Sequence, residues 1–195
     1  AGNIVDGDVI LAILAADHQR RTGLQTVVTT VMTNLGFTRA MRELGIEVIQ
    51  TQVGDRYVRE AMLAGEHPLG GEQSGHIIMT DYSTTGDGVL TAIRLLSVLA
   101  RSGQSLTELA RIMQRMPQVL VNVGGVDRDR LPDAEAVWQA VRDEGDALGD
   151  RGRILVRASG TEPLVRVMVE ADTEPRAADV AERLAKIVNA ELSLT

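Results

Sequence analysis

Apolar residues recur with a helical period and then a strand period several times along the first part of the chain. A helix is expected over residues 8–21, where Val9, Ile10, Ile13 and Leu14 share a face and Gly23 can supply a left-handed stop. Val and Thr then dominate residues 26–33, which is typical of a buried strand. The alternation continues with expected helices at 37–44 and 55–63 and strands at 46–50 and 77–79. It predicts a mixed, three-layer α/β domain.

Two more helices are expected before the pattern changes. Asp87 can cap a helix that runs to Ala100, with a buried stripe formed by Leu90, Ile93, Leu96 and Leu99. Ser105 and Glu108 have capping-box spacing and predict a helix to about residue 115. Pro117 follows, where a helix cannot easily continue. We therefore predict one domain over residues 1–116 and a second over residues 117–195.

The second domain has a different order of elements. Strands are expected at 119–123, 154–157 and 164–170, and helices at 133–144 and 175–192. Residues 164–170 are apolar on nearly both faces, which predicts the central strand of a sheet. The result is a small α+β domain of β-α-β-β-α order.

Composition narrows the classes of function. The net charge of −7 and the aromatic content of 2% argue against a nucleic-acid partner. No run approaches the ~18 apolar residues of a membrane span, so no membrane insertion is expected. The chain has no cysteine, which fits a reducing cytoplasm. Any bound anion must be held by a local group of hydrogen-bond donors, because the electrostatic field of the net negative charge repels anions.

The first candidate site is the segment GGEQSGH, which precedes an expected strand. Glycines allow a ligand to approach the backbone, and a carboxylate, an amide and a hydroxyl can share the hydrogen bonds of sugar hydroxyls. A plain glycine-rich turn with a solvated Glu is the alternative, and composition alone favours it. The candidate residues are Glu72, Gln73, Ser74, Gly75 and His76.

The second candidate site is the segment RASGTEP, which joins two expected strands. Arg157 can pair with two phosphate oxygens, and the backbone around Gly160 can form a concave nest of N–H groups. Ser159 and Thr161 add two hydroxyls. An ordinary hairpin turn in which Arg157 pairs with Glu162 explains the residues equally well.

Both segments together resemble the α-D-phosphohexomutase superfamily, and their variants are similar to its glucosamine branch. There a GE-x-SG-H loop binds sugar hydroxyls and an R-x-SG-TEP loop binds the substrate's phosphate. TQVGDRYV at 51–58 and TTGDG at 84–88 also resemble it, so the similarity covers essentially the whole chain. The resemblance implies a third, sugar-binding domain over 1–116, without its N-terminal edge, and a fourth, phosphate-binding domain over 117–195 that is TATA-binding-protein-like.

The resemblance also implies roles for individual residues. Glu72 and Ser74, with Gln73 and Gly75 in the same loop, would contact the sugar ring, and His76 would carry a proton near its reacting end. The clamp on the non-reacting phosphate would consist of Arg157, Ser159, Gly160 and Thr161, assisted by Arg166. Asp55 and Arg56 would lie in a loop facing the cleft, although capping of the next helix explains Asp55 equally well.

The implied reaction moves phosphate between positions 6 and 1 of glucosamine through a hexosamine 1,6-bisphosphate and feeds UDP-N-acetylglucosamine and cell-wall synthesis. The phosphoserine and the Mg²⁺ loop that it needs have no counterpart in these residues, so we expect them in an N-terminal half of the enzyme and expect this chain alone to be inactive. Asp6 and Asp8 are interpreted as turn and helix-cap residues, and Asp127 and Asp129 as a solvated charge cluster. A homodimer is compatible with this interpretation.

Two alternatives remain open at this point. The substrate of the same superfamily could be a phosphomannose or a phosphoglucose. The chain could instead be a non-catalytic sugar-phosphate-binding module that works alone.

Overall fold

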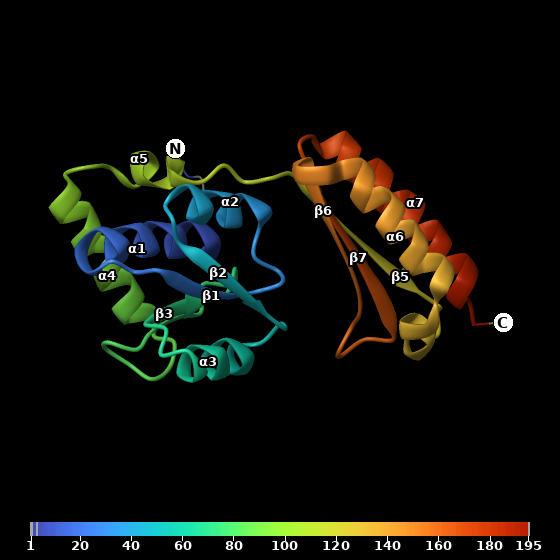
Figure 1. Ribbon diagram of the computed structural model, residues 1–195, viewed down its shortest axis with the longest axis horizontal. Coiled ribbons are helices and arrows are strands. Elements are labelled where there is room, and N and C mark those ends of the chain that lie inside the picture. Colours follow the sequence, from blue (N-terminus) through green and yellow to red (C-terminus); the bar gives the residue numbers. More distant parts are fainter. Residues whose placement is uncertain (1, 3, 195) are drawn as a thin grey trace. The chain divides into compact units, whose positions relative to one another are not determined.

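A computed structural model describes residue 2 and residues 4–194, and the chain divides into two compact units. The larger unit ends at Arg115 and the smaller unit begins at Met116 (Figure 1).

The larger unit is built on a four-stranded sheet with the order β2-β1-β3-β4. Strand β1 pairs in parallel with both β2 and β3, and β4 is antiparallel to β3. The strands are β1 (Thr26–Thr30), β2 (Glu47–Thr51), β3 (Leu69–Gly71) and β4 (Ile77–Met79). The helices are α1 (Gly7–Thr22), α2 (Leu35–Glu43), α3 (Asp55–Ala64), α4 (Gly88–Ser102) and α5 (Leu106–Leu109).

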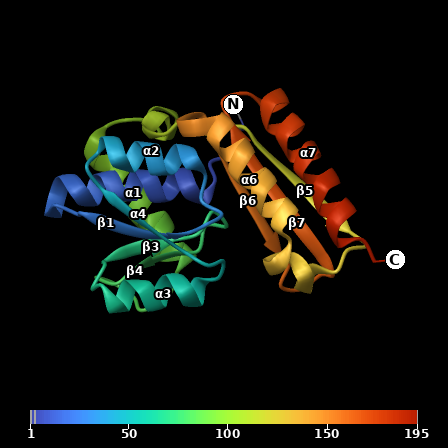
Figure 2. The same cartoon turned by 45° about the vertical axis from the view of Figure 1, so that its right-hand side comes forward.

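Helices cover both faces of this sheet. Helices α1 and α2 lie on one face and α3 lies on the other, as Figures 1 and 2 show. Side chains alternate accordingly, because successive strand residues point to opposite faces. Val27 and Ile77 join the cluster under α1 and α2, whereas Val28 and Ile78 pack with Val58 of α3. The predicted three-layer α/β domain is confirmed.

Helix α1 has the predicted extent but a different cap. The carboxylate of Asp6 accepts a hydrogen bond from Val9 N at 3.1 Å, and Gly23 ends the helix in the left-handed conformation. The interpretation of Asp8 as a cap is wrong. Its side chain is fully buried (0% exposed) and accepts from Asn34 N, 26 residues away, at 2.9 Å. Burial raises the pKa of Asp8 from 3.8 to about 6, against the lowering effect of the Asn34 N–H.

Three other local expectations needed correction. Strand β1 ends at Thr30, because the chain turns where Thr33 N donates to Thr30 O. Strand β3 was not predicted, since Leu69–Gly71 lacks any apolar alternation. The helix expected to reach residue 115 has the predicted capping box but ends early, with α5 followed by the 3₁₀ turn Ala110–Ile112. Met113 is then extended and buried.

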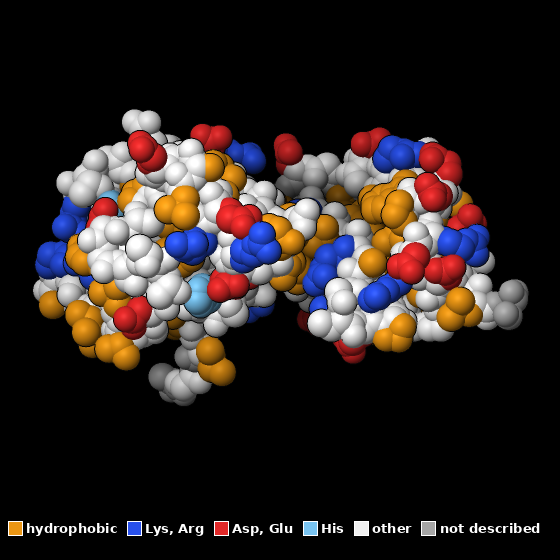
Figure 3. All heavy atoms as spheres, turned by 90° about the horizontal axis from the view of Figure 1, so that it is seen from below, with side chains coloured by type: hydrophobic (Ala, Val, Ile, Leu, Met, Phe, Trp, Pro, Cys, Tyr) orange, Lys and Arg blue, Asp and Glu red, His pale blue; other side chains and the backbone are white. Residues whose placement is uncertain are grey.

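The predicted buried stripe of α4 is wrong at two of its four positions: Leu90 packs, partly buried, against the apolar cluster and Leu99 is half-buried, but Ile93 and Leu96 are exposed. Thr91 and Val98 are the buried residues of this helix, whereas Val89, Ile93 and Leu96 are 72%, 55% and 64% exposed. The three lie four and three residues apart and therefore form one apolar surface, which we call the α4 face. Apolar side chains are visible on the surface of the larger unit in Figure 3 (orange).

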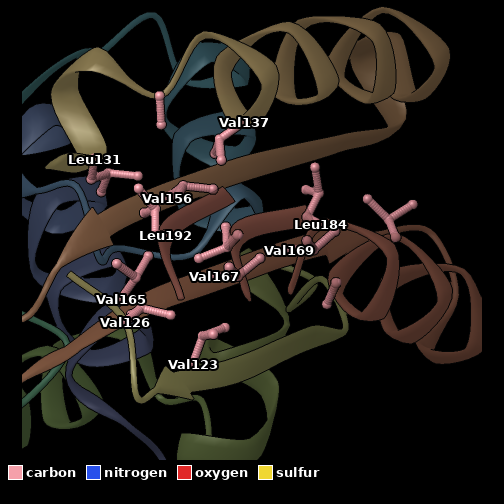
Figure 4. Packing of buried hydrophobic residues seen from close by; sticks show 14 of the residues in the cluster. Val123, Val126, Leu131, Val137, Val156, Val165, Val167, Val169, Leu184 and Leu192 are labelled. Carbon is pink, nitrogen blue, oxygen red and sulfur yellow. The ribbon is translucent and has the colours of Figure 1, made fainter. Parts of the chain in front are cut away.

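The smaller unit is a three-stranded antiparallel sheet with the order β5-β7-β6. Its elements follow the predicted β-α-β-β-α order, and β7 is the central strand, as predicted. Val165, Val167 and Val169 of β7 point toward the helices into one apolar cluster (Figure 4). The elements are β5 (Gln118–Gly124), α6 (Glu135–Leu148), β6 (Gly152–Ala158), β7 (Leu164–Ala171) and α7 (Glu174–Leu192), with 3₁₀ turns at Arg128–Asp133 and Gly149–Arg151.

The first residue of α1 holds the segment that follows β3. Gly7 N donates to Gln73 O at 3.1 Å. A Cβ atom placed on Gly7 would lie 2.5 Å from both Gln73 O and Gly75 N, which is closer than real Cβ contacts. Glycine at position 7 therefore allows the helix to press directly against the backbone of residues 72–75.

Asp8→Asn is expected to make the larger unit less sensitive to pH. The raised pKa means that the folded state binds a proton more tightly than the unfolded state, so this contribution is fully present below pH 3.8 and is lost as the pH rises through about 6. A shift of this size corresponds to about 3 kcal/mol. Urea unfolding at pH 4 and pH 7.5 should show that Asp8→Asn gains stability relative to the wild type as pH rises. Glu47→Gln, an exposed carboxylate, is the control, and equal pH profiles for both variants would contradict the expectation.

Gly7→Ala is expected to destabilise the larger unit by about 1–3 kcal/mol, because the added methyl group overpacks against backbone atoms. Gly88→Ala is the matched control: Gly88 is also the first residue of a helix, yet nothing lies within 4 Å of its Cβ position. That control should be neutral or stabilising by up to ~1 kcal/mol. Chemical denaturation of both variants measures the difference, and equal effects would exclude close packing as the cause.

Candidate functional site

The first candidate segment lies at one edge of the larger unit's sheet. Because β1, β2 and β3 are parallel, the segments that follow them leave the sheet at the same edge. These segments are residues 31–34, 52–54 and 72–76. Open α/β sheets bind ligands at this carboxyl edge. The topology therefore puts Glu72 to His76 where a ligand site is expected.

Backbone and side-chain bonds give the segment a fixed shape. Glu72 N donates to His76 O at 3.0 Å, and Gly75 N donates to Glu72 O at 2.9 Å. One carboxylate oxygen of Glu72 accepts from Gly54 N at 3.2 Å, ahead of α3. The other oxygen has no hydrogen bond among the described residues, and the Ser74 side chain is exposed. The loop is thus tied both to α1 and to the start of α3.

His76 lies beside Asp55, with 3.7 Å between His76 Nε2 and Asp55 Oδ2. Gly54 is the N-cap of α3 and no side chain caps it, so the capping explanation for Asp55 is wrong. A Cβ atom on Gly86 would lie 2.5 Å from the His76 ring, so the segment 84–88 packs against the imidazole. Arg56 instead pairs with Glu60 along the surface of α3 at 2.8 Å.

Two polar atoms of this loop are buried without a hydrogen-bond partner. They are Gln73 Nε2 and His76 Nε2. Buried polar groups are nearly always hydrogen-bonded in folded proteins, so these two atoms are exceptions to the usual pattern. Both atoms belong to residues that the sequence singled out.

The second candidate segment lies between β6 and β7. Arg157 and Arg166 are directly opposite each other in the antiparallel pair, on the face turned away from the helices. Like charges at this position repel. Glu162 pairs with Arg166 at 2.6 Å and not with Arg157, so the ordinary-turn alternative for Arg157 is not the pairing that forms.

Arg157 has no ion pair anywhere in the part of the chain that the structure describes. Burial, and then the charge of Arg166, lower the pKa of the Arg157 guanidinium. Arg166 Nε is itself buried without a hydrogen-bond partner. The strands therefore present two guanidiniums and one carboxylate, a local excess of positive charge.

The turn itself leaves two backbone donors unused. Ser159 N donates to Leu164 O at 2.9 Å, and Glu162 N donates to Ser159 Oγ at 3.3 Å. Ser159 is only 3% exposed, so in this conformation its hydroxyl shapes the turn. Gly160 N and Thr161 N have no hydrogen-bond acceptor among the described residues. Adjacent free N–H groups of this kind suit an anion.

Two residues in contact with these segments were missed by the sequence reasoning. Gly7 presses against the first segment, and Arg128 donates to carbonyl oxygens of the second. Gly7 follows a cap-forming Asp, a signal that could have marked it as a tight helix start. Arg128 lies in a charged run of alternating signs, and no local pattern indicated its contacts.

Metal binding has no support in the described residues, where no three His, Cys, Asp or Glu side chains come together to hold an ion. These residues do not fit a Mg²⁺ site. In the same part of the chain, every helix is too short or too polar to cross a bilayer.

Comparisons with known proteins agree on one family. Residues 6–116 match the family model for phosphoglucomutase/phosphomannomutase, alpha/beta/alpha domain III, and residues 120–187 match the model for the C-terminal domain. In fold, the chain is similar to N-acetylphosphoglucosamine mutase from Aspergillus fumigatus, solved with GlcNAc-6P and magnesium. The TM-score is 0.80 at 20% identity, over 98% of this chain and 46% of that one.

Curated relatives extend the match over nearly the whole chain. A phosphoglucosamine mutase from Frankia alni is 60% identical over 194 residues, and one from Thermobifida fusca is 54% identical over 195 residues. These matches cover 98% and 99% of this chain but only 43% of each relative. The chain, which spans less than half the length of these relatives, belongs to the phosphoglucomutase/phosphomannomutase family and corresponds to its domains III and IV.

Proposed function

We propose that this chain is the substrate-binding, C-terminal part of a phosphoglucosamine mutase, which interconverts glucosamine 6-phosphate and glucosamine 1-phosphate. The relatives that cover nearly all of the chain carry this name and are 54–60% identical to it. A hexose phosphate has two kinds of group to recognise, hydroxyls and a phosphate, and each unit of the chain has a segment suited to one of them.

The unpaired Arg157 opposite Arg166 is the observation that carries the proposal. A phosphate monoester carries a charge of about −1.5 to −2 at pH 7, and it can accept from two guanidiniums and from backbone N–H groups at once. Glu162 pairs with Arg166, so phosphate would replace that carboxylate at Arg166 and would give Arg157 an anionic partner. Binding therefore relieves the repulsion across the two strands.

The loop after β3 would hold the sugar. The second carboxylate oxygen of Glu72 and the Ser74 hydroxyl accept from ring hydroxyls, and Gln73 and Gly75 complete the loop. His76, which lies beside Asp55, would carry a proton at the reacting end of the sugar. Asp55 would stabilise the imidazolium when the proton is on His76.

A phosphate held away from the reacting centre supplies binding energy that orients the sugar. The phosphoserine that exchanges phosphate, and the Mg²⁺ that the fold relative was solved with, would come from the N-terminal part of the enzyme. The product of the first transfer is a 1,6-bisphosphate, and its second orientation uses the same contacts. We place the reaction in the cytoplasm, in keeping with a chain that has no cysteine.

Arg157→Ala should weaken the binding of glucosamine 6-phosphate by about 1.5–3 kcal/mol, the range for hydrogen bonds to charged groups. Calorimetric titration of the 195-residue chain measures this loss. Arg151→Ala removes the same charge just ahead of β6 and should change little. Unchanged affinity for Arg157→Ala would reject the phosphate assignment.

Sugar specificity requires the complete enzyme. This chain can be fused to the portion of the Frankia alni relative that precedes its match, and the fusion assayed with phosphates of glucosamine, glucose and mannose. We expect glucosamine phosphate to be preferred. Preference for a non-amino sugar would overturn the branch of the family, and binding without turnover of any sugar would leave a binding module.

A further inference from the structure

We infer that Arg128 is a positioning residue that holds the turn after β6 in its anion-binding shape. The inference rests on the proposed function, because it concerns the same phosphate site. Arg128 Nη1 donates to Ser159 O and, at 2.8 Å, to Glu162 O. These two carbonyl groups are at the start and the end of the segment that contains Gly160 and Thr161.

The contact decides which backbone groups of the turn face a ligand. A carbonyl oxygen carries a partial negative charge and repels phosphate, whereas an N–H group attracts it. Arg128 Nη1 donates to both Ser159 O and Glu162 O, and so directs both carbonyls toward Arg128, although Glu162 O also accepts from Leu164 N at 2.9 Å. The N–H groups of Ser159 and Glu162 are used inside the turn. The N–H groups of Gly160 and Thr161 are then the donors left for an anion.

The backbone on both sides of Arg128 is anchored by hydrogen bonds and apolar packing. Val126 is buried in the apolar cluster and bridges to Ser193, and Asp127 N donates to Leu192 O at 2.8 Å at the end of α7. On the other side, Trp138 Nε1 of α6 donates to Leu131 O at 2.8 Å. The backbone around Arg128 is thus anchored to both helices of the smaller unit. The Arg128 side chain therefore links this anchored backbone to a turn about 30 residues further along the chain.

Charge alone does not explain the geometry. Asp129 lies 3.8 Å from Arg128 Nε and is a weaker partner than the two carbonyls that Nη1 contacts. In a solvated charge cluster the Arg128 guanidinium would be surrounded by water. Instead it donates to two carbonyl groups of the turn between β6 and β7. The remaining arginine of the run, Arg130, is exposed and forms no ion pair in the described part of the chain, so it provides a control with the same charge.

The test uses the 195-residue chain and the variants Arg128→Met, Arg128→Lys and Arg130→Met. Amide NMR spectra follow Gly160 and Thr161 during titration with glucosamine 6-phosphate and, separately, with inorganic phosphate. Arg128→Met should raise both dissociation constants about tenfold, because the turn loses the charge-assisted hydrogen bonds that hold its shape. Arg128→Lys should recover most of the affinity, because one ammonium group can donate to both carbonyls. Arg130→Met should stay within about twofold of the wild type.

Free-protein spectra separate this inference from the proposed function. Arg128→Met should shift the Gly160 and Thr161 amides before any ligand is added, with the melting temperature and the remaining amides of the smaller unit close to those of Arg130→Met. Equal binding by Arg128→Met and Arg130→Met, with wild-type affinity intact, would overturn the role of Arg128 alone. A wild type that binds neither glucosamine 6-phosphate nor phosphate would overturn the proposed function, while the free-protein shifts would still report on the turn.

Discussion

The parallel pairing of β1 with both β2 and β3 is the constraint on which the larger unit depends. It forces three chain segments to leave the sheet at one edge, and it requires helices on both faces to carry the chain back. The segment after β3 is held there by Gly7, whose lack of a side chain lets α1 approach its backbone. Position and shape of the candidate sugar loop thus follow from a strand order and one close contact, before any ligand is considered.

In the smaller unit the helices cover only one face of the sheet, so the two faces need different side chains. Val165, Val167 and Val169 take the covered face, and alternation then puts Arg166 on the other face, opposite Arg157. Two cations opposite each other on paired strands repel, and Arg157 forms no ion pair with any described residue, whereas Arg166 pairs with Glu162. Arg128 adds order to the turn between the two strands by donating to two of its carbonyl groups.

The periodicity of apolar residues predicted most of the helices and the order of all strands and long helices in the smaller unit. A long apolar pattern fits one kind of secondary structure much better than the other. Periodicity gave wrong predictions where the same residues are compatible with more than one structure. Helix α4 is apolar on more than one side, and hydrophobicity alone does not tell which stripe is covered, so Ile93 and Leu96 were misplaced. Strand β3 is mostly glycine and has no pattern to detect. Both candidate segments were found from their residue types. Arg128 was missed, because its partners lie 31 and 34 positions further along the chain.

The opposition of Arg157 and Arg166 has a practical consequence for anyone who handles this protein. At the proposed phosphate site, a multivalent anion that accepts from both side chains would bind the folded form, and mass action would then raise the melting temperature with anion concentration. Sulfate and phosphate salts would then occupy the proposed site and would not act as inert components of a buffer. Zwitterionic buffers with chloride at matched ionic strength are the appropriate reference medium for measurements on the smaller unit.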